Sequence, residues 1–418
     1  MEALSLVFLV GAILIGVILK VNIGIVAIGS SLILGTMAGM SAGAIRGGFP
    51  TTLFVTLLGV MVLFGIATEN KTLALLCQRI LYLAGNRVYL IPFVIFFFSA
   101  ALAAIGPGAI PVMSLMSVFA CSLAAEMKVS PVVLATAVML GACGGGLTPV
   151  APTGIIGLTL AYEAGITGIE MAYAINSIVA LFISFVILYF ALGGYKMKSE
   201  MDLTAVELPS FDRNQIFTMI GILIMVVLVI GFGYDVGLTA FAIAAVLLFL
   251  RTANEKEVLA TVSWSTLVLI CGVQVLMSMT FSLGGIDLMA RGLATIMTPA
   301  TAPGILAVSA GIMSWFASTS GVVMPTLIPT IPAIMAEVGG SVTYTSMISA
   351  VTNTAHSAAM SPFSTGGALG ISAYSQIAKP APEEHSKLLI RMFLTSAASV
   401  AIVSAIAFLG LYNILAPI

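Results

Sequence analysis

The residues best suited to chemistry are hydroxyl side chains grouped where glycine and proline break apolar helices. In the stretch 316–325, Ser318, Thr319 and Ser320 stand directly before a glycine. A second group surrounds a break near residue 362, and it consists of Asn353, Thr354, Ser357, Ser361, Ser364 and Thr365. The first half of the chain offers Thr148 and Thr153, each beside a proline. Hydroxyl oxygens and carbonyls released by a broken helix are suitable ligands for a hard monovalent cation such as Na+.

The same breaks expose helix N-termini. Free N–H groups and the helix dipole favour an anion there, even without Lys or Arg. We therefore expect a small anion held by helix ends and hydroxyls, with bound cations as countercharge. The candidate substrate-binding residues are Gly106, Pro107, Thr148, Pro149, Thr153, Ser318, Thr319, Ser320, Asn353, His356, Ser361 and Thr365.

Each of these residues also has a purely structural interpretation. Ser and Thr in membrane helices often bond back to their own turn, and the run 144–146 of three glycines could serve close helix packing. His356 is the exceptional titratable group at predicted membrane depth, so it is either a satisfied buried imidazole or a contact for substrate or a proton.

Composition identifies the broad class. Hydrophobic residues make up 60% of the 418 residues and charged residues 7%, and the mean hydropathy is +1.20. Several apolar runs reach the ~20 residues that a membrane helix needs, so we expect a polytopic membrane protein. No basic stripe suggests nucleic acid. The cysteines Cys77, Cys121, Cys143 and Cys271 lack metal-ligand spacing and are interpreted as apolar filler. No basic segment precedes the first apolar run, so a cleaved signal peptide is not expected.

The elements that must position the site follow from hydropathy and from helix breakers. We expect all-α structure, with spans at 4–19, 23–40, 50–69, 170–194, 216–233, 237–252, 260–283 and 388–414. Interfacial helices are expected at 71–84 and 285–297, re-entrant hairpins at 89–125 and 303–335, and broken helices at 131–163 and 343–376. The tip 105–108 has neither charge nor amide, which places it at membrane depth facing protein or a water-filled cavity. The alternative is a pair of ordinary spans with a tight turn.

The two halves repeat one unit at a constant offset of 213 residues. The offset pairs Gly24 with Gly237, Gly59 with Gly272, Gly108 with Gly321, Pro149 with Pro362 and Gly154 with Gly367. A hairpin returns to the side it entered, so each half crosses the membrane five times. An odd number inverts the second copy, which predicts an inverted-topology repeat of the kind found in secondary transporters. The first inverted repeat is expected at 1–195, a polar linker at 196–213 and the second repeat at 214–418.

Orientation follows from the basic residues. With the N-terminus outside, thirteen of the fifteen Lys and Arg residues are cytoplasmic, and Arg46 and Arg291 remain outside. This predicts a multi-pass protein of the bacterial inner membrane, with the linker 196–213 in the cytoplasm.

These features together resemble the divalent anion/sodium symporters of the ion transporter superfamily, and most closely their malonate and dicarboxylate carrier branch. The similarity covers the inverted repeats, an interfacial helix before each hairpin and a Thr/Ser-Pro break after it. That family carries Ser-Asn-Thr at both tips. Here Ser318-Thr319-Ser320 keeps the hydroxyls, whereas Ile105-Gly106-Pro107 keeps no side-chain ligand. The resemblance implies Na+ ligands at Ile105, Gly106, Gly144, Gly145, Ser318, Thr319, Ser357 and Ala358.

The resemblance also implies a homodimer in which a transport domain moves like an elevator, while 23–69 and 237–283 form a fixed scaffold. We therefore expect a secondary active transporter that imports a small dicarboxylate, either malonate or a C4-dicarboxylate, coupled to Na+. The expected partners are a small carboxylate anion, the lipid bilayer and a second copy of the chain, without nucleic acid.

Two other functional classes are considered, a proton-coupled transporter and an intramembrane enzyme. The first is a proton-coupled carboxylate carrier or a cation/proton antiporter on the same scaffold, and it remains open. An enzyme is not expected, because the chain has no Gly-x-Ser-x-Gly, no His-Glu-x-x-His and no paired intramembrane carboxylates. A channel fits inverted repeats with broken helices less well than a carrier does.

Overall fold

The computed structural model describes residues 1–19, 21–76, 88–127, 129–197, 210–262, 264–340, 342–362, 364–378 and 382–415. All regular secondary structure in these ranges is helical, which confirms the predicted all-α class. The predicted interfacial helix 71–84 lies outside the described residues from 77 onward, and so does most of the predicted linker, 198–209.

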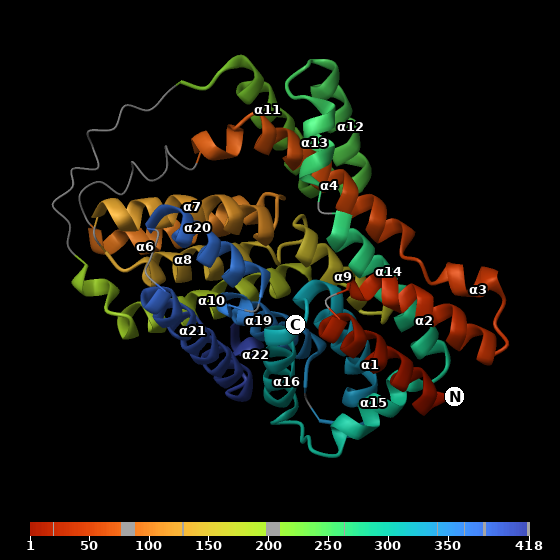
Figure 1. The fold of residues 1–418 in the computed structure, drawn as a ribbon. Helices are drawn as coiled ribbons and strands as arrows, with labels where there is room; N and C mark the ends of the chain where they lie inside the picture. Colours follow the sequence, from red (N-terminus) through yellow and green to blue (C-terminus); the bar gives the residue numbers. More distant parts are fainter. Residues whose placement is uncertain are drawn as a thin grey trace.

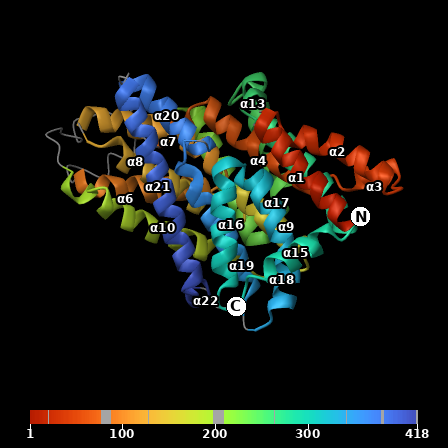
Figure 2. The same ribbon diagram turned by 60° about the horizontal axis from the view of Figure 1, so that its bottom comes forward.

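The helices form two groups that lie side by side (Figures 1 and 2). We call the first group the bundle. Its members are α6 (Ile91–Ala104), α7 (Ala109–Met127), α8 (Pro131–Gly145), α10 (Glu170–Ala191), α16 (Ala302–Phe316), α19 (Tyr344–Ser357), α20 (Thr365–Ala378), α21 (Pro382–Phe408) and α22 (Leu411–Leu415).

We call the second group the flanking helices. Its members are α1 (Glu2–Leu19), α2 (Ile23–Met37), α3 (Ala42–Gly47), α4 (Thr51–Glu69), α11 (Arg213–Val226), α12 (Val236–Phe249), α13 (Glu255–Thr261), α14 (Trp264–Ser282) and α15 (Gly285–Ala294). Between the two groups lie α9 (Pro152–Glu163), α17 (Met324–Leu327) and α18 (Ile331–Val338).

Two helix crossings in the flanking group depend on glycine. In the crossing of α4 with α12, a Cβ added to Gly59 would lie 2.5 Å from the carbonyl oxygen of Gly237. In the crossing of α2 with α14, a Cβ on Gly24 or on Gly272 would overlap the other helix's backbone. Small residues let membrane helices approach this closely. The two crossings use equivalent positions, since Gly24 and Gly237 are 213 residues apart, as are Gly59 and Gly272.

The bounds of the helices follow the same offset. Helices α2 and α12 begin at Ile23 and Val236, and α4 and α14 begin at Thr51 and Trp264. Both pairs of starting residues are 213 positions apart. The inverted orientation of the second half remains a prediction.

Both hairpin tips interrupt helices inside the protein. The first connects α6 to α7 through a turn in which Gly106 and Gly108 have φ values of 145° and 78°. The second leaves α16 through extended backbone at Ala317 and Ser318 and re-enters as the π-helix η5 (Thr319–Val323). It continues through α17, the 3-10 helix η6 (Ile328–Thr330) and α18.

Each broken helix also has an irregular centre. In the first, α8 ends at Gly145 and α9 begins at Pro152, with turns between them. In the second, α19 is followed by the 3-10 helix η7 (Ala358–Met360), and α20 begins at Thr365.

Several predicted bounds are corrected by the structure. The predicted span 260–283 begins at Trp264 as α14, and a separate helix, α13, ends before it at Thr261. Asn254 caps α13 by accepting from the backbone N–H of Lys256 and Glu257. The final span begins at Pro382 rather than at 388, with Glu383 paired to Lys387 at 2.8 Å in its first turns. The span 216–233 changes to a π-helix over Val227–Gly231. A short helix, α3, precedes the span expected at 50–69 and is capped by Ser41.

Only some of the helices in the described residues are long enough to span a membrane. Within the described residues, Ala42–Glu69, Glu170–Ala191, Thr319–Val338 and Glu383–Phe408 are long and apolar enough to cross a membrane, and α14 with α15 forms a pair bent by 80°. The other apolar helices have 10–17 residues. A 15-residue helix is only about 22 Å long, which is shorter than the ~30 Å hydrocarbon core of a bilayer. Four of these short helices have one end at a hairpin tip or a break, namely Val88–Ala104, Ala109–Ala125, Pro131–Gly145 and Ala302–Phe316. The other four were predicted as full spans but are shorter than the ~20 residues of a straight span, namely Glu2–Gly16, Ile23–Met37, Arg213–Val229 and Val236–Phe249.

Candidate functional site

The tips and breaks enclose a cavity of about 200 Å³, which we call the site cavity. Its wall comes from α7, α8, α9, α16, η5, α19, η7 and α20. Its polar lining consists of Cys143, Thr153, Ser314, Ser318, Thr319, Ser320, His356, Ser364 and Thr365. The site therefore draws on both halves of the chain.

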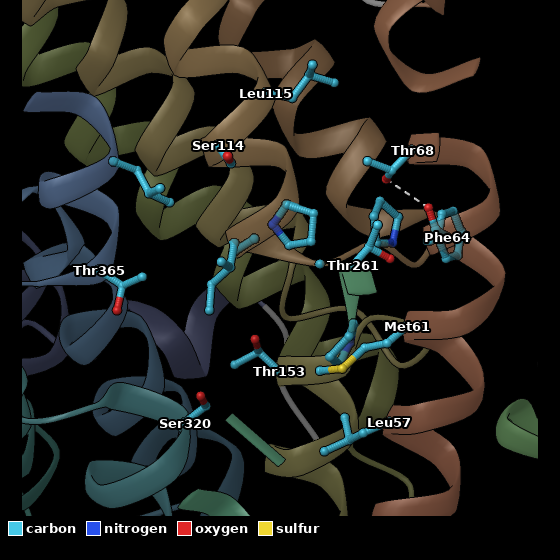
Figure 3. A pocket seen from close by; sticks show the side chains of 18 of the residues that line it. Leu57, Met61, Phe64, Thr68, Ser114, Leu115, Thr153, Thr261, Ser320 and Thr365 are labelled. Atoms are coloured by element: carbon cyan, nitrogen blue, oxygen red, sulfur yellow. Dashed lines mark hydrogen bonds between the residues drawn. The ribbon is translucent and has the colours of Figure 1, made fainter. Parts of the chain in front are cut away.

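A larger cavity of about 480 Å³ adjoins the site cavity, and we call it the entrance cavity. The two share Ala109, Ile110, Thr153, Ser320 and Thr365. In Figure 3, Thr153, Ser320 and Thr365 lie around one space, opposite the α4 side chains Leu57, Met61 and Phe64. The entrance cavity is thus hydroxyl-lined towards the site and mostly apolar towards α4, where the one hydroxyl, that of Thr68, donates to the Phe64 carbonyl.

Several helix N-termini meet at these cavities. The first residues of α7 (Ala109), α9 (Pro152 and Thr153), η5 (Thr319) and α20 (Thr365) all line one or both cavities. Some of these N–H groups already have partners, since Ser318 Oγ accepts from the Gly321 N–H and Ser364 Oγ from the Gly367 N–H, both at 3.2 Å. In α9, Pro152 has no N–H and the Gly154 N–H donates to the Gly146 carbonyl at 3.0 Å, which leaves the N–H of Thr153. The first N–H groups of a helix have no intrahelical partner, so these ends create a positive potential.

Fixed charge does not contribute to that potential. Among the described residues that line the site and entrance cavities, none is Lys, Arg, Asp or Glu. The site can accept an anion through backbone dipoles and hydroxyls, as binding at helix N-termini requires.

Three oxygens form a compact triangle beside the second tip. The Ser314 hydroxyl donates to the Ala355 carbonyl at 2.7 Å, and its Oγ lies 2.6 Å from Thr319 Oγ1. The Thr319 hydroxyl lies 3.3 Å from the same carbonyl. Ala355 is in the last turn of α19, where carbonyls lack intrahelical partners and the dipole is negative. Two hydroxyls and one carbonyl at such an end are a donor set that suits Na+.

His356 occupies the wall between the two broken helices. It is 6% exposed, and its Nδ1 lies 2.7 Å from the Thr352 carbonyl. In the neutral ring, Nδ1 then carries the proton and Nε2 is left as an acceptor. The carbonyl of His356 accepts a hydrogen bond from Cys143 Sγ at 3.5 Å, between residues 213 positions apart.

The structure brings together half of the predicted substrate-binding residues. Thr153, Ser318, Thr319, Ser320, His356 and Thr365 line the site cavity. Pro107 lines the entrance cavity, and Gly106 lies beneath the ring of Phe64.

The other predicted residues stand outside both cavity linings. The Thr148 hydroxyl donates to the Ala104 carbonyl at 3.0 Å and so joins the first break to the first tip. Ser361 is fully buried, with its backbone N–H bonded to the Ala358 carbonyl. Asn353 is fully buried within α19, and Pro149 lies in the turn before α9.

The predicted Na+ ligands also fall into two groups, those that line the site cavity and those that do not. Ser318 and Thr319 line the site cavity. Ser357 Oγ donates to the Thr354 carbonyl, and the Ala358 carbonyl accepts from Ser396 Oγ at 3.1 Å. In the first half, Ile105 is 39% exposed, Gly144 faces α10 near Ile178, and Gly145 fits closely against the Ala100 carbonyl.

Two residues of the site were missed from the sequence. Ser314 is one turn before the second tip, and a helix-period count from Ser318 could have identified it. Cys143 was interpreted as filler, which accounts for its burial but not for its place in the cavity wall. Ser364, named with the second break, also lines the cavity and caps α20.

Comparisons with known proteins agree with this architecture. Residues 1–146 match the family described as the dicarboxylate carrier protein MatC N-terminus. The fold is similar to that of the YdaH transporter of Alcanivorax borkumensis, with a TM-score of 0.61 and 14% identity over 89% of each chain. It is also similar to MtrF of Neisseria gonorrhoeae, described within a class of antimetabolite efflux pumps, with a TM-score of 0.55 and 14% identity over 90% of this chain and 84% of that one. The comparison with curated proteins gives no match.

These matches bear on the expectations drawn from the sequence. The match over residues 1–146 supports the dicarboxylate carrier-like family that the sequence resemblance predicts, and the two solved structures show a similar fold. The matched proteins are transport proteins rather than enzymes, in agreement with the expectation that this chain is not an enzyme. The matches also support a multi-pass membrane transporter.

Proposed function

From the support for a dicarboxylate carrier-like family, we propose that this protein is a secondary active transporter that imports a small dicarboxylate together with Na+. The observation that carries the proposal is the meeting of the N-termini of α7, α9, η5 and α20 around one cavity without a basic side chain. Because helix N-termini hold anions through N–H groups and dipoles, this arrangement can bind a carboxylate.

The size of the cavity supports a small substrate. At about 200 Å³ the site cavity is below the ~300–1,000 Å³ of pockets for drug-sized ligands. Malonate or a C4-dicarboxylate fits this scale, and N-termini on several sides of the cavity suit two carboxylates better than one.

Na+ coupling is supported by the oxygen triangle of Ser314, Thr319 and Ala355. A cation there lies at the C-terminal ends of α16 and α19, while the anion lies at N-termini of η5 and α20. Opposite ends of broken helices thus supply opposite partial charges to the two solutes. Each bound ion lowers the electrostatic cost of the other, which links the two binding events.

Alternating access is supported by a third cavity of about 550 Å³. Its lining residues Gln274, Met277, Ser278 and Phe281 are each 213 positions after Met61, Phe64, Gly65 and Thr68 of the entrance cavity. The third cavity shares no lining residue with the site cavity. We assign the two cavities to opposite sides of an inverted repeat, with the structure open through the entrance cavity.

In this scheme the bundle and both tips move against a scaffold of α2, α4, α12 and α14, held in a homodimer. The basic residues Lys71, Arg251 and Lys256 follow the ends of α4 and α12 near Thr68 and Thr261, so the entrance cavity faces the cytoplasm of a bacterial inner membrane. A Gln274 Nε2 to Glu163 Oε2 hydrogen bond of 2.9 Å joins scaffold to α9 on the other side.

Uptake by the full chain in proteoliposomes tests the proposal. Labelled malonate and succinate are each offered under an inward Na+ gradient, with choline replacing Na+ in the paired sample and empty liposomes as the control. We expect uptake of at least one dicarboxylate in Na+ and a loss of that uptake in choline. Uptake unchanged by choline contradicts Na+ coupling, and no uptake of either dicarboxylate contradicts the assigned substrate class.

A proton-coupled carrier is the second candidate, and it is favoured by the position of His356 in the cavity wall. The matched experiment applies an inward pH gradient without Na+. Flux under these conditions that disappears in His356→Gln supports proton coupling. No flux without Na+, together with Na+-driven flux in His356→Gln, excludes the imidazole as the relay.

A further inference from the structure

The site lies where the two repeats meet, so equivalent positions can be compared across it. Cys143 and His356 are equivalent at the 213-residue offset, they contact each other, and both line the site cavity. A contact between equivalent positions is expected on the axis that relates two repeats. Each half could therefore present the same donor set to the cavity.

The second half presents oxygens. Ser314 Oγ, Thr319 Oγ1 and the Ala355 carbonyl lie within 2.6 to 3.3 Å of one another. Ser314 is 3% exposed and lines the site cavity with Thr319. Rotation of the two hydroxyl hydrogens away from this triangle turns all three oxygens into acceptors that can face a cation.

The first half presents none of the equivalent side-chain oxygens. The residues equivalent to Ser314 and Thr319 are Ala101 and Gly106. The carbonyl equivalent to that of Ala355 belongs to Ala142, and it accepts the backbone N–H of Gly146 at 2.8 Å. The three oxygens of the second half are therefore reduced in the first half to one, the Ala142 carbonyl oxygen, which lacks the two neighbouring hydroxyls.

The local packing also leaves no room at this position for a side chain like that of Thr319. A Cβ on Gly106 would overlap the Phe64 ring, so that ring fills the space that the Thr319 side chain occupies in the other half. Gly106 has a φ of 145°, which side-chain-bearing residues rarely adopt. The nearby Ala104 carbonyl accepts from Thr148 Oγ1.

We infer that this carrier binds a single coupling Na+ per chain, at the second tip, and that the first tip is an apolar stop without a cation. The inference rests on the proposed Na+ coupling and deepens it by fixing the number and place of the ions. It also makes the site electrically asymmetric, because the second half holds a cation beside the N-termini of η5 and α20, whereas the first half supplies only the N-termini of α7 and α9.

Equilibrium binding of radioactive sodium to the purified full chain in detergent tests the inference. We expect one ion per chain and a Hill coefficient of about 1, since a Hill coefficient is limited by the number of sites. Thr319→Val removes an oxygen at nearly constant shape and should weaken binding by about tenfold or more. Thr319→Ser keeps the oxygen and should restore binding, which separates a ligand role from misfolding.

A control and an independent readout accompany the binding assay. Ser309→Ala is the matched control, because Ser309 lies on α16 but bonds its own helix at the Ile305 carbonyl. The fluorescence of Trp315, which follows Ser314, reports on the site in a Trp264→Phe background that leaves it as the sole tryptophan. Its sodium titration should have the same midpoint as the binding assay and should shift with Thr319→Val but not with Ser309→Ala.

The outcomes separate this inference from the proposed function. Two ions per chain, or binding unaffected by Thr319→Val, overturns the single-site inference even when dicarboxylate uptake requires Na+. One ion per chain that follows the Thr319 variants supports the inference, and a failure of dicarboxylate uptake in the same preparation then contradicts the substrate class alone. No sodium binding overturns both the inference and Na+ coupling.

Discussion

The two hairpin tips occupy equivalent places in the chain but differ in the side chains that they present. The second tip carries hydroxyls at Ser318, Thr319 and Ser320, and its backbone changes from extended to π-helical around them. The first tip carries Gly106 and Gly108 with positive φ values and packs beneath Phe64. The irregular backbone of the second tip presents polar side chains, whereas that of the first tip forms a tight turn. Repetition of a fold thus need not repeat its chemistry.

The largest expected effect concerns packing at the first tip. Gly106→Ala adds a Cβ that overlaps the Phe64 ring at a φ of 145°. Steric overlap and backbone strain together should lower stability by about 3 kcal/mol. Thermal unfolding in detergent measures the change, and Gly29→Ala is the control, because nothing lies within 4 Å of a Cβ there. Adding Phe64→Leu should recover part of the loss; equal melting of wild type and Gly106→Ala contradicts the close fit.

The next effect concerns the oxygen triangle at the second tip. Ser314→Ala removes the hydroxyl that joins Thr319 to the Ala355 carbonyl. We expect the Na+ concentration for half-maximal dicarboxylate uptake to rise about tenfold, as the loss of a bond to a charged group predicts. Uptake is measured over a sodium series in proteoliposomes. A rise in the substrate requirement with an unchanged sodium requirement would assign Ser314 to the anion instead.

A smaller effect is expected where the first break meets the first tip. Thr148→Val removes the hydrogen bond to the Ala104 carbonyl, at 3.0 Å, while keeping the shape of the side chain. We expect stability to fall by about 1 kcal/mol and the sodium requirement of uptake to stay the same. A changed sodium requirement would show that the first tip takes part in cation binding and would weaken the contrast between the tips.

The smallest effect is expected away from both tips. Ser309→Ala removes a hydroxyl that bonds within its own helix to the Ile305 carbonyl at 2.9 Å. Stability should change by less than about 0.5 kcal/mol, and neither the sodium nor the dicarboxylate dependence of uptake should change. Any shift in sodium dependence would indicate that effects on α16 spread beyond the oxygen triangle.

The sequence predicts the helical class and the places of the breaks because glycine and proline restrict the backbone directly. The tip at 105–108 and the break beginning after Gly145 lie where these residues stand. Helix starts set by polar caps were less visible, as at Asn254 and Ser41, since a hydropathy pattern ignores side chains that bond backbone N–H groups.

The candidate site was predicted in part. The run 318–320 was evident because several hydroxyls adjoin a break. Ser314 and Cys143 were not recognised, because each lies inside a regular apolar helix and reaches the cavity only through helix packing. Thr148 was assigned to substrate, but its partner at Ala104 is 44 residues away in sequence, a contact that no local pattern reveals.

The most direct test of the account is an experimental map of the full chain prepared with malonate and Na+. We predict anion density in the site cavity, within hydrogen-bonding distance of the N-termini of α7, α9, η5 and α20, with cation density beside Ser314 and Thr319. Malonate bound elsewhere, or held by Lys or Arg side chains, would contradict the central claim that helix ends and hydroxyls bind the transported anion.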